Sequence, residues 1–89
     1  MLKIDISKRA AKFLSKLTPK NARQIGTKIQ ELRLNPTPHD SQLLKGYAPL
    51  RRLDIGEFRV IYCFDTQLVI ITLVGKRNDS DVYKQLKRL

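Results

Sequence analysis

The side chains best suited to chemistry are two arginines and a tyrosine near the C-terminal end, Arg59, Arg77 and Tyr83. A guanidinium group is planar and permanently charged, and it can bind two phosphate oxygens at once. A tyrosine can stack on a base or hydrogen-bond a hydroxyl group. These residue types suit the cleavage of RNA, which brings its own nucleophile, the 2′-hydroxyl. The protein then has to hold the backbone bent, neutralise the developing charge and manage two protons, and no metal is required.

Other catalytic chemistries find little support in the residues present. The sequence has no cluster of cysteine and histidine, no set of inward carboxylates and no glycine-rich phosphate loop, so we expect neither a protein-bound metal nor a cofactor. His39 is the only histidine and stands beside a proline in a loop, where a solvated side chain is the simpler interpretation. Cys63 lies in an apolar strand and is more simply a small buried hydrophobe than a reactive thiol.

Two strand-like runs must position the arginines. Residues 57–64 alternate, which places large apolar side chains on one face and Arg59 on the other. Residues 68–74 are apolar almost throughout, which is typical of a strand in the middle of a sheet. A two-residue loop at 65–66 would join the two strands and set Arg59 opposite Thr72.

A strand at residues 50–54 precedes these runs and turns at residues 55–56. The same alternation sets Arg52 opposite Arg59. Like charges directly opposite each other on neighbouring strands are destabilising, so the pair is interpreted as a site for an anion. A plainer alternative is that Arg59 is a solvated strand arginine or the partner of a nearby acid.

The N-terminal half reads as a strand followed by two helices. Residues 2–6 alternate as a strand does, and Ser7 is a good N-cap for the first helix. Thr18 followed by Pro19 starts the second helix, which residues 35–36 end. Because the connection is so short, the helices should form an antiparallel hairpin.

The remaining segments complete one α+β domain over residues 1–89, in the order β-α-α-β-β-β-α. The helical hairpin should pack on a mostly antiparallel, four-stranded sheet. Residues 35–42 are expected to form an irregular loop, and Asp79 or Ser80 should cap a short last helix. The weak apolar stripe of that helix is expected to cover the apolar part of the second sheet face. That part consists of Ile61, Leu68 and Ile70.

The composition fits one small basic domain. The 89 residues are 42% hydrophobic and carry a formal net charge of +10, which predicts attraction to polyanions or to an acidic protein. One cysteine cannot form an internal disulfide, no apolar stretch could span a bilayer, and the start lacks a signal-peptide pattern. We therefore expect a cytoplasmic protein without a membrane partner.

Two segments, LKGYAPLRRLDIGEFRVIYCFD and VGKRNDSDVY, resemble the RelE/ParE superfamily of toxins from bacterial and archaeal type II toxin–antitoxin systems. The resemblance covers essentially the whole chain, and the second segment looks more like the RelE branch. RelE toxins cleave messenger RNA in the ribosomal A site, without a metal, by attack of the 2′-hydroxyl on the adjacent phosphate. The resemblance therefore implies a RelE-like fold and an endoribonuclease (mRNA interferase) that inhibits translation.

The resemblance also implies a role for individual residues. Arg59 matches the family arginine that stabilises the charge of the scissile phosphate, and Arg52 matches a lysine or arginine that assists it. Arg77 matches the arginine proposed to assist the leaving 5′-oxygen, and Tyr83 the tyrosine that stacks on the substrate nucleotide. RelE proper has a lysine, sometimes assigned as the base, where this chain has Leu50. The resemblance therefore leaves the general base open.

The implied partners are a cognate antitoxin with an acidic, partly disordered binding segment, the ribosome with its mRNA, and operator DNA through the antitoxin complex only. Two other functions are compatible with the residues. One is a ParE-like inhibitor that binds DNA gyrase, and the other is a degenerate toxin without catalysis, which Leu50 favours. In plainer structural terms, Tyr83 could cover the sheet as an amphipathic cap and Arg77 could be a loop charge.

Overall fold

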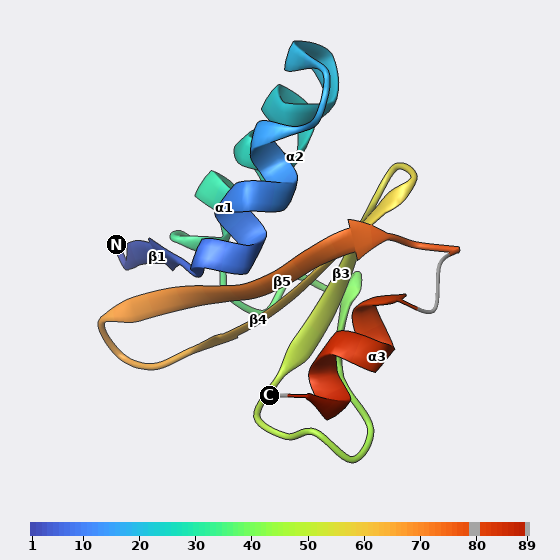
Figure 1. Cartoon of the computed structure of the whole chain (residues 1–89). Coiled ribbons are helices and arrows are strands. Elements are labelled where there is room, and N and C mark those ends of the chain that lie inside the picture. Colours follow the sequence, from blue (N-terminus) through green and yellow to red (C-terminus); the bar gives the residue numbers. More distant parts are fainter. Residues whose placement is uncertain (79–80, 89) are drawn as a thin grey trace.

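The structure is a computed structural model and describes residues 1–78 and 81–88. A single mixed sheet carries two helices on one face and a short helix on the other (Figure 1). In chain order the elements are β1 (Lys3–Ile6), α1 (Lys8–Ser15), α2 (Pro19–Leu32), β2 (Ser41–Leu43), β3 (Arg51–Ile55), β4 (Phe58–Phe64), β5 (Leu68–Lys76) and α3 (Asp81–Lys87). The predicted α+β class is confirmed, while the predicted cap of the last helix falls outside the described residues.

The sheet has the strand order β1-β5-β4-β3-β2. β1 lies at one edge and runs parallel to β5, whereas the other neighbouring pairs are antiparallel. The prediction of a mostly antiparallel sheet is confirmed. The predicted four strands are wrong by one, because β2 forms the opposite edge of a five-stranded sheet.

β2 lies at the end of the segment that the sequence predicts to be an irregular loop. It is three residues long, which is too short to show an alternating pattern. A distant residue secures it, because Arg51 donates from Nε and Nη2 to Ser41 Oγ at 3.2 and 3.1 Å. The buried Ser41 hydroxyl in turn donates to the carbonyl of Pro38 at 2.9 Å. The strand therefore depends on β3 and not on its own sequence.

Both helices of the hairpin begin where the sequence predicts. Ser7 Oγ accepts a hydrogen bond from the backbone N–H of Ala10 at 3.1 Å, and Thr18 Oγ1 accepts one from Asn21 at 3.3 Å. α2 ends at Leu32, a little before the predicted stop. Figure 1 shows the two helices as an antiparallel pair above the sheet. Their apolar sides bury the larger of two cores against β3, β4 and β5.

The β4–β5 register differs from the predicted one. Arg59 faces Gly75 and not Thr72, a displacement of three residues. Two of these come from the hairpin loop, which is longer than predicted because Asp65 accepts hydrogen bonds from the backbone N–H groups of Gln67 and Leu68, each at 2.8 Å. The third comes from a bulge between residues 61 and 62.

The β3–β4 register also differs, and the expected pairing of Arg52 with Arg59 is wrong. The turn lies at residues 56–57, where Gly56 takes the left-handed conformation with φ of +58°, so β3 continues to Ile55. Arg59 therefore faces Asp54, and Arg52 faces the apolar Ile61. A shift of two residues preserves the face, so both arginines still lie on the same side of the sheet.

α3 covers this second face. Val82 and Leu86 are buried against Leu44, Ile61 and Leu73. The prediction that the last helix covers Ile61 is confirmed. It is wrong for Leu68 and Ile70, which are only half-buried and lie outside this core. The register explains the difference, because Leu73 is the β5 residue that pairs with Ile61.

Candidate active site

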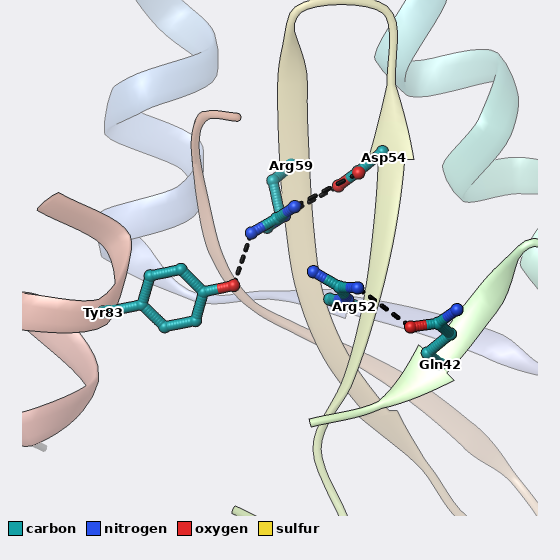
Figure 2. A network of polar contacts seen from close by, with 5 residues as sticks. All are labelled: Gln42, Arg52, Asp54, Arg59 and Tyr83. Carbon is teal, nitrogen blue, oxygen red and sulfur yellow. Dashed lines mark hydrogen bonds and ion pairs between the residues drawn. The ribbon is translucent and has the colours of Figure 1, made fainter. Parts of the chain in front are cut away.

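Arg59 is the centre of a polar network on the α3 side of the sheet (Figure 2). Its Nε donates to Asp54 Oδ1 at 2.7 Å and its Nη2 to Oδ2 at 3.2 Å, which makes the ion pair bidentate. Its Nη1 donates to the hydroxyl of Tyr83, and its Cζ lies 5.7 Å from the centroid of that ring. The guanidinium plane is therefore held from two sides, by a strand residue and by a helix residue.

Backbone register and one glycine produce this arrangement. Asp54 and Arg59 are direct cross-strand partners, so their side chains leave the same face side by side. On the other flank Arg59 faces Gly75, which is buried and has no side chain to occupy the space. A Cβ on Gly75 would lie only 2.2 Å from Val82 Cγ2. The glycine therefore lets α3 approach the sheet closely enough for Tyr83 to reach Arg59.

Arg52 lies on the same face and is held from the edge strand. Its Nη2 donates to Oε1 of Gln42 at 2.9 Å, a contact that Figure 2 shows beside the Arg59 pair. Gln42 comes from β2, the strand that the sequence did not predict, so sequence reasoning missed it. Arg52 and Arg59 therefore lie on the same face of the sheet, as predicted. Each binds its own partner, and the two are not opposite each other.

Arg77 follows β5 and is exposed. Its backbone N–H donates to the carbonyl of Glu57 at 2.8 Å, which ties the residue to the turn between β3 and β4. Its charge acts on Asp54, as described next. The structure thus places Arg77 near the turn between β3 and β4, where its charge reaches Asp54 and its side chain is open to solvent.

Electrostatics link all three arginines to one carboxylate. The hydrogen bond from Arg59 is the largest effect and lowers the pKa of Asp54, burial opposes it, and the charges of Arg59, Arg52 and Arg77 each lower the pKa by a smaller amount. The same hydrogen bond raises the pKa of Arg59. Three cations surrounding one anion leave a net positive charge, so this surface attracts anions.

Asp54 is the second residue that sequence reasoning missed. Alternation already places it on the same face as Arg52, because the two positions differ by two along one strand. Correct placement of the turn at Gly56 would have set it opposite Arg59. The available signal was the glycine, which favours the left-handed conformation at a two-residue hairpin loop.

The remaining candidates are placed away from catalytic roles. Leu50 is half-buried against the core under α3, against which Tyr47 and Tyr83 also pack, so its role is apolar packing. His39 is exposed in the loop before β2. Cys63 is half-buried, and burial raises the pKa of its thiol, which disfavours the reactive thiolate.

Within the described part of the chain, histidine, cysteine and carboxylate side chains nowhere gather in groups of three or more that could hold a metal ion. Among residues 1–78 and 81–88, no helix is both long and apolar enough to cross a membrane.

Comparison with known proteins identifies the family. Residues 4–80 match the family described as the ParE toxin of the type II toxin–antitoxin system parDE. A protein of Methanocaldococcus jannaschii named as a toxin, RelE1, is 35% identical over 82 residues, which cover 86% of this chain and 91% of that protein. The chain belongs to the RelE/ParE superfamily of toxins. It is a toxin of a type II toxin–antitoxin system, of the RelE type.

Solved structures confirm the RelE-like fold. The free toxin RelE of E. coli, in a double arginine-to-alanine mutant, superposes with a TM-score of 0.82 at 25% identity, over 99% of this chain and 97% of that chain. The archaeal RelE of a RelE–RelB complex from Pyrococcus horikoshii superposes with a TM-score of 0.76 at 25% identity, over 86% of this chain and 96% of that chain. The Pyrococcus horikoshii structure is a complex of RelE with RelB.

Proposed function

We propose that this toxin is a ribosome-dependent endoribonuclease that cuts mRNA in the ribosomal A site and so inhibits translation. The 2′-hydroxyl of one nucleotide attacks the adjacent phosphate, and no protein-bound metal takes part. One observation carries the proposal. Arg59 is held between Asp54 and Tyr83, and the charges of two further arginines also act on that Asp54 carboxylate. This surface has the charge that a phosphorane transition state needs.

Each residue has a task in this mechanism. Arg59 neutralises charge on the non-bridging phosphate oxygens, and Arg52 adds to the positive field from β3. Tyr83 provides a ring on which the substrate base stacks, and its contact with Arg59 sets the distance between base and phosphate. Arg77, exposed after β5, stabilises charge on the leaving 5′-oxygen. Stacking on one side and charge on the other would hold the RNA bent for in-line attack.

The test is primer extension on a defined message, incubated with purified toxin in the presence or absence of programmed ribosomes. We expect cuts at A-site codons only when ribosomes are present. Toxin stripped with EDTA and desalted before the reaction should cut as well as untreated toxin. Arg77→Ala should abolish cutting while the protein stays folded, and Arg23→Ala, an exposed arginine of α2, should cut normally. Full cutting by Arg77→Ala would refute its assignment.

A second candidate is inhibition of DNA gyrase by binding, because the matching family is described by its ParE toxin. In that case messages stay intact, purified toxin inhibits gyrase supercoiling, and Arg59 and Arg77 are replaceable. A toxin without catalysis, favoured by the apolar Leu50, would inhibit neither reaction but would still bind its antitoxin. Both activities can be measured on the same preparation.

The net charge of +10 supports an acidic antitoxin segment and the ribosome as partners, and the resemblance to the family adds operator DNA. The antitoxin segment that binds here is acidic and folds on binding, and operator DNA is bound only by the toxin–antitoxin complex. The ribosome is attracted through its RNA, so docking weakens as salt rises. All of these partners are in the cytoplasm, where the toxin acts.

A further inference from the structure

The proposed function requires a group that removes the proton from the 2′-hydroxyl, and the family position for it holds Leu50. That side chain is half-buried among apolar neighbours and has no atom that accepts a proton. Of the two side chains that bind Arg59 in the described part of the chain, one is the hydroxyl of Tyr83, which accepts a hydrogen bond from Nη1 and belongs to the ring proposed to stack on the substrate base. The other is a carboxylate, Asp54.

Asp54 has the position and the exposure that a base needs. It is the direct cross-strand partner of Arg59, and its oxygen lies 2.7 Å from Nε of that guanidinium. Its side chain is 37% exposed, whereas that of Arg59 is 11% exposed, so RNA can reach the carboxylate while the arginine beneath stays fixed. A phosphate bound to Arg59 would carry its attacking 2′-oxygen within about 3 to 3.5 Å of phosphorus, and therefore beside Asp54.

We infer that Asp54 is the general base of this toxin, an inference that rests on the proposed endoribonuclease function. The 2′-hydroxyl gives its proton to the Asp54 carboxylate as the bond between 2′-oxygen and phosphorus forms. The bond between phosphorus and the 5′-oxygen then breaks, and that oxygen leaves with the electron pair, next to Arg77, and takes a proton from water. The products are a 2′,3′-cyclic phosphate and a 5′-hydroxyl, and Asp54 returns its proton to solvent.

Substrate binding prepares this base. In the free protein the carboxylate occupies the Nε–Nη2 edge of Arg59, the edge that a phosphate would also bind. A phosphodiester that takes this edge releases Asp54 but leaves it adjacent. Loss of the arginine hydrogen bond raises the pKa of the carboxyl toward its ordinary value, which makes it a stronger base while it stays ionised at neutral pH. Arg52, Arg59, Arg77 and the hydroxyl of Tyr83 are the charged and titratable groups around it.

The test compares Asp54→Asn with Glu57→Gln in single-turnover cutting of ribosome-bound message from pH 5 to pH 9. The second variant is the matched control, because it removes the same charge three positions away at the exposed turn. We expect Asp54→Asn to cut about 10²- to 10⁴-fold more slowly, as loss of a general base does. Its half-saturating concentration of ribosome complex should stay equal or fall, since Arg59 is then free to bind phosphate. Glu57→Gln should behave like the original protein.

The pH profile separates a base from a positioning residue. The unmodified toxin should reach a plateau above the pKa of the carboxyl in the complex, whereas residual cutting by Asp54→Asn should rise about tenfold per pH unit with hydroxide. Unchanged cutting by Asp54→Asn, or a slower rate with an unchanged pH profile, would overturn the inference. Faster cutting would overturn it too and would make Asp54 a counter-ion that competes with substrate. If the unmodified toxin leaves the message intact, the proposed function itself fails.

Discussion

Gly75→Ala should displace α3 and disable the site from a position that never touches RNA. The added Cβ would lie 2.2 Å from Val82 Cγ2, whereas ordinary contact begins at 3.4 Å, so this methyl group must give way by about 1.2 Å, and because Val82 is buried we expect α3 to move with it. Overpacking of this kind costs about 1–3 kcal/mol. For a domain of this size, that lowers Tm by roughly 4–24 °C. A helix withdrawn this far no longer brings the Tyr83 hydroxyl to Arg59.

The assay is thermal unfolding followed by circular dichroism, combined with cutting of ribosome-bound message. Gly26→Ala is the matched control, because no atom lies within 4 Å of the added Cβ in α2. In a helix interior this change should stabilise the protein by about 0.5–1 kcal/mol. The double variant Gly75→Ala/Val82→Ala removes the collision and should recover part of the activity. An unchanged Tm and full cutting by Gly75→Ala would refute the role given to this glycine.

Three further predictions concern stability. Tyr62→Phe should destabilise by about 0.5–1.5 kcal/mol in urea unfolding, because the buried hydroxyl donates to the carbonyl of Pro36 at 2.7 Å. Ser7→Ala should cost about 1–2 kcal/mol by the same measurement, through loss of the α1 cap and of the hydrogen bond to the carbonyl of Thr72, and an equal loss on Ser15→Ala would contradict this assignment. The pKa of Asp54 is lower in the folded protein than in the unfolded chain. Its ion pair therefore stabilises the fold at any pH above the pKa of the unfolded chain, and this stabilisation is lost as the pH falls through the pKa of the folded protein. Between pH 5 and pH 2, the unmodified protein should therefore lose slightly more stability than Asp54→Asn, and parallel curves would contradict the ion pair.

Features that depend on local sequence could be predicted. Ser7 and Thr18 cap helices because each side chain bonds a backbone N–H three residues ahead, and nothing distant is needed. The class of fold and the face on which Arg52 and Arg59 lie follow from alternation, which survives a register shift of two.

Features that depend on the length of a turn could not be predicted in the same way. The Asp65 turn and the bulge before Tyr62 each add residues that alternation cannot count. The expected opposition of Arg52 and Arg59 was wrong for a similar reason, because the turn between β3 and β4 lies at Gly56 and sets Asp54, the residue proposed as the base, opposite Arg59. Gln42 was missed for another reason, since its strand depends on contacts from β3.

The parallel pairing of β1 with β5 bears on when the site around Arg59 can form as the chain folds. Lys3 pairs with Leu68, and the Ser7 hydroxyl donates to the carbonyl of Thr72 at 2.6 Å, so the first strand and the first helix are completed by residues 65 positions further along the chain. Such distant pairings close slowly and late. The helical hairpin is made before β5, the inner strand that helps to bury its apolar side. Arg59 can contact Tyr83 only after α3 has been made. The polar network around Arg59 is therefore expected to form late in folding, after the sheet has closed.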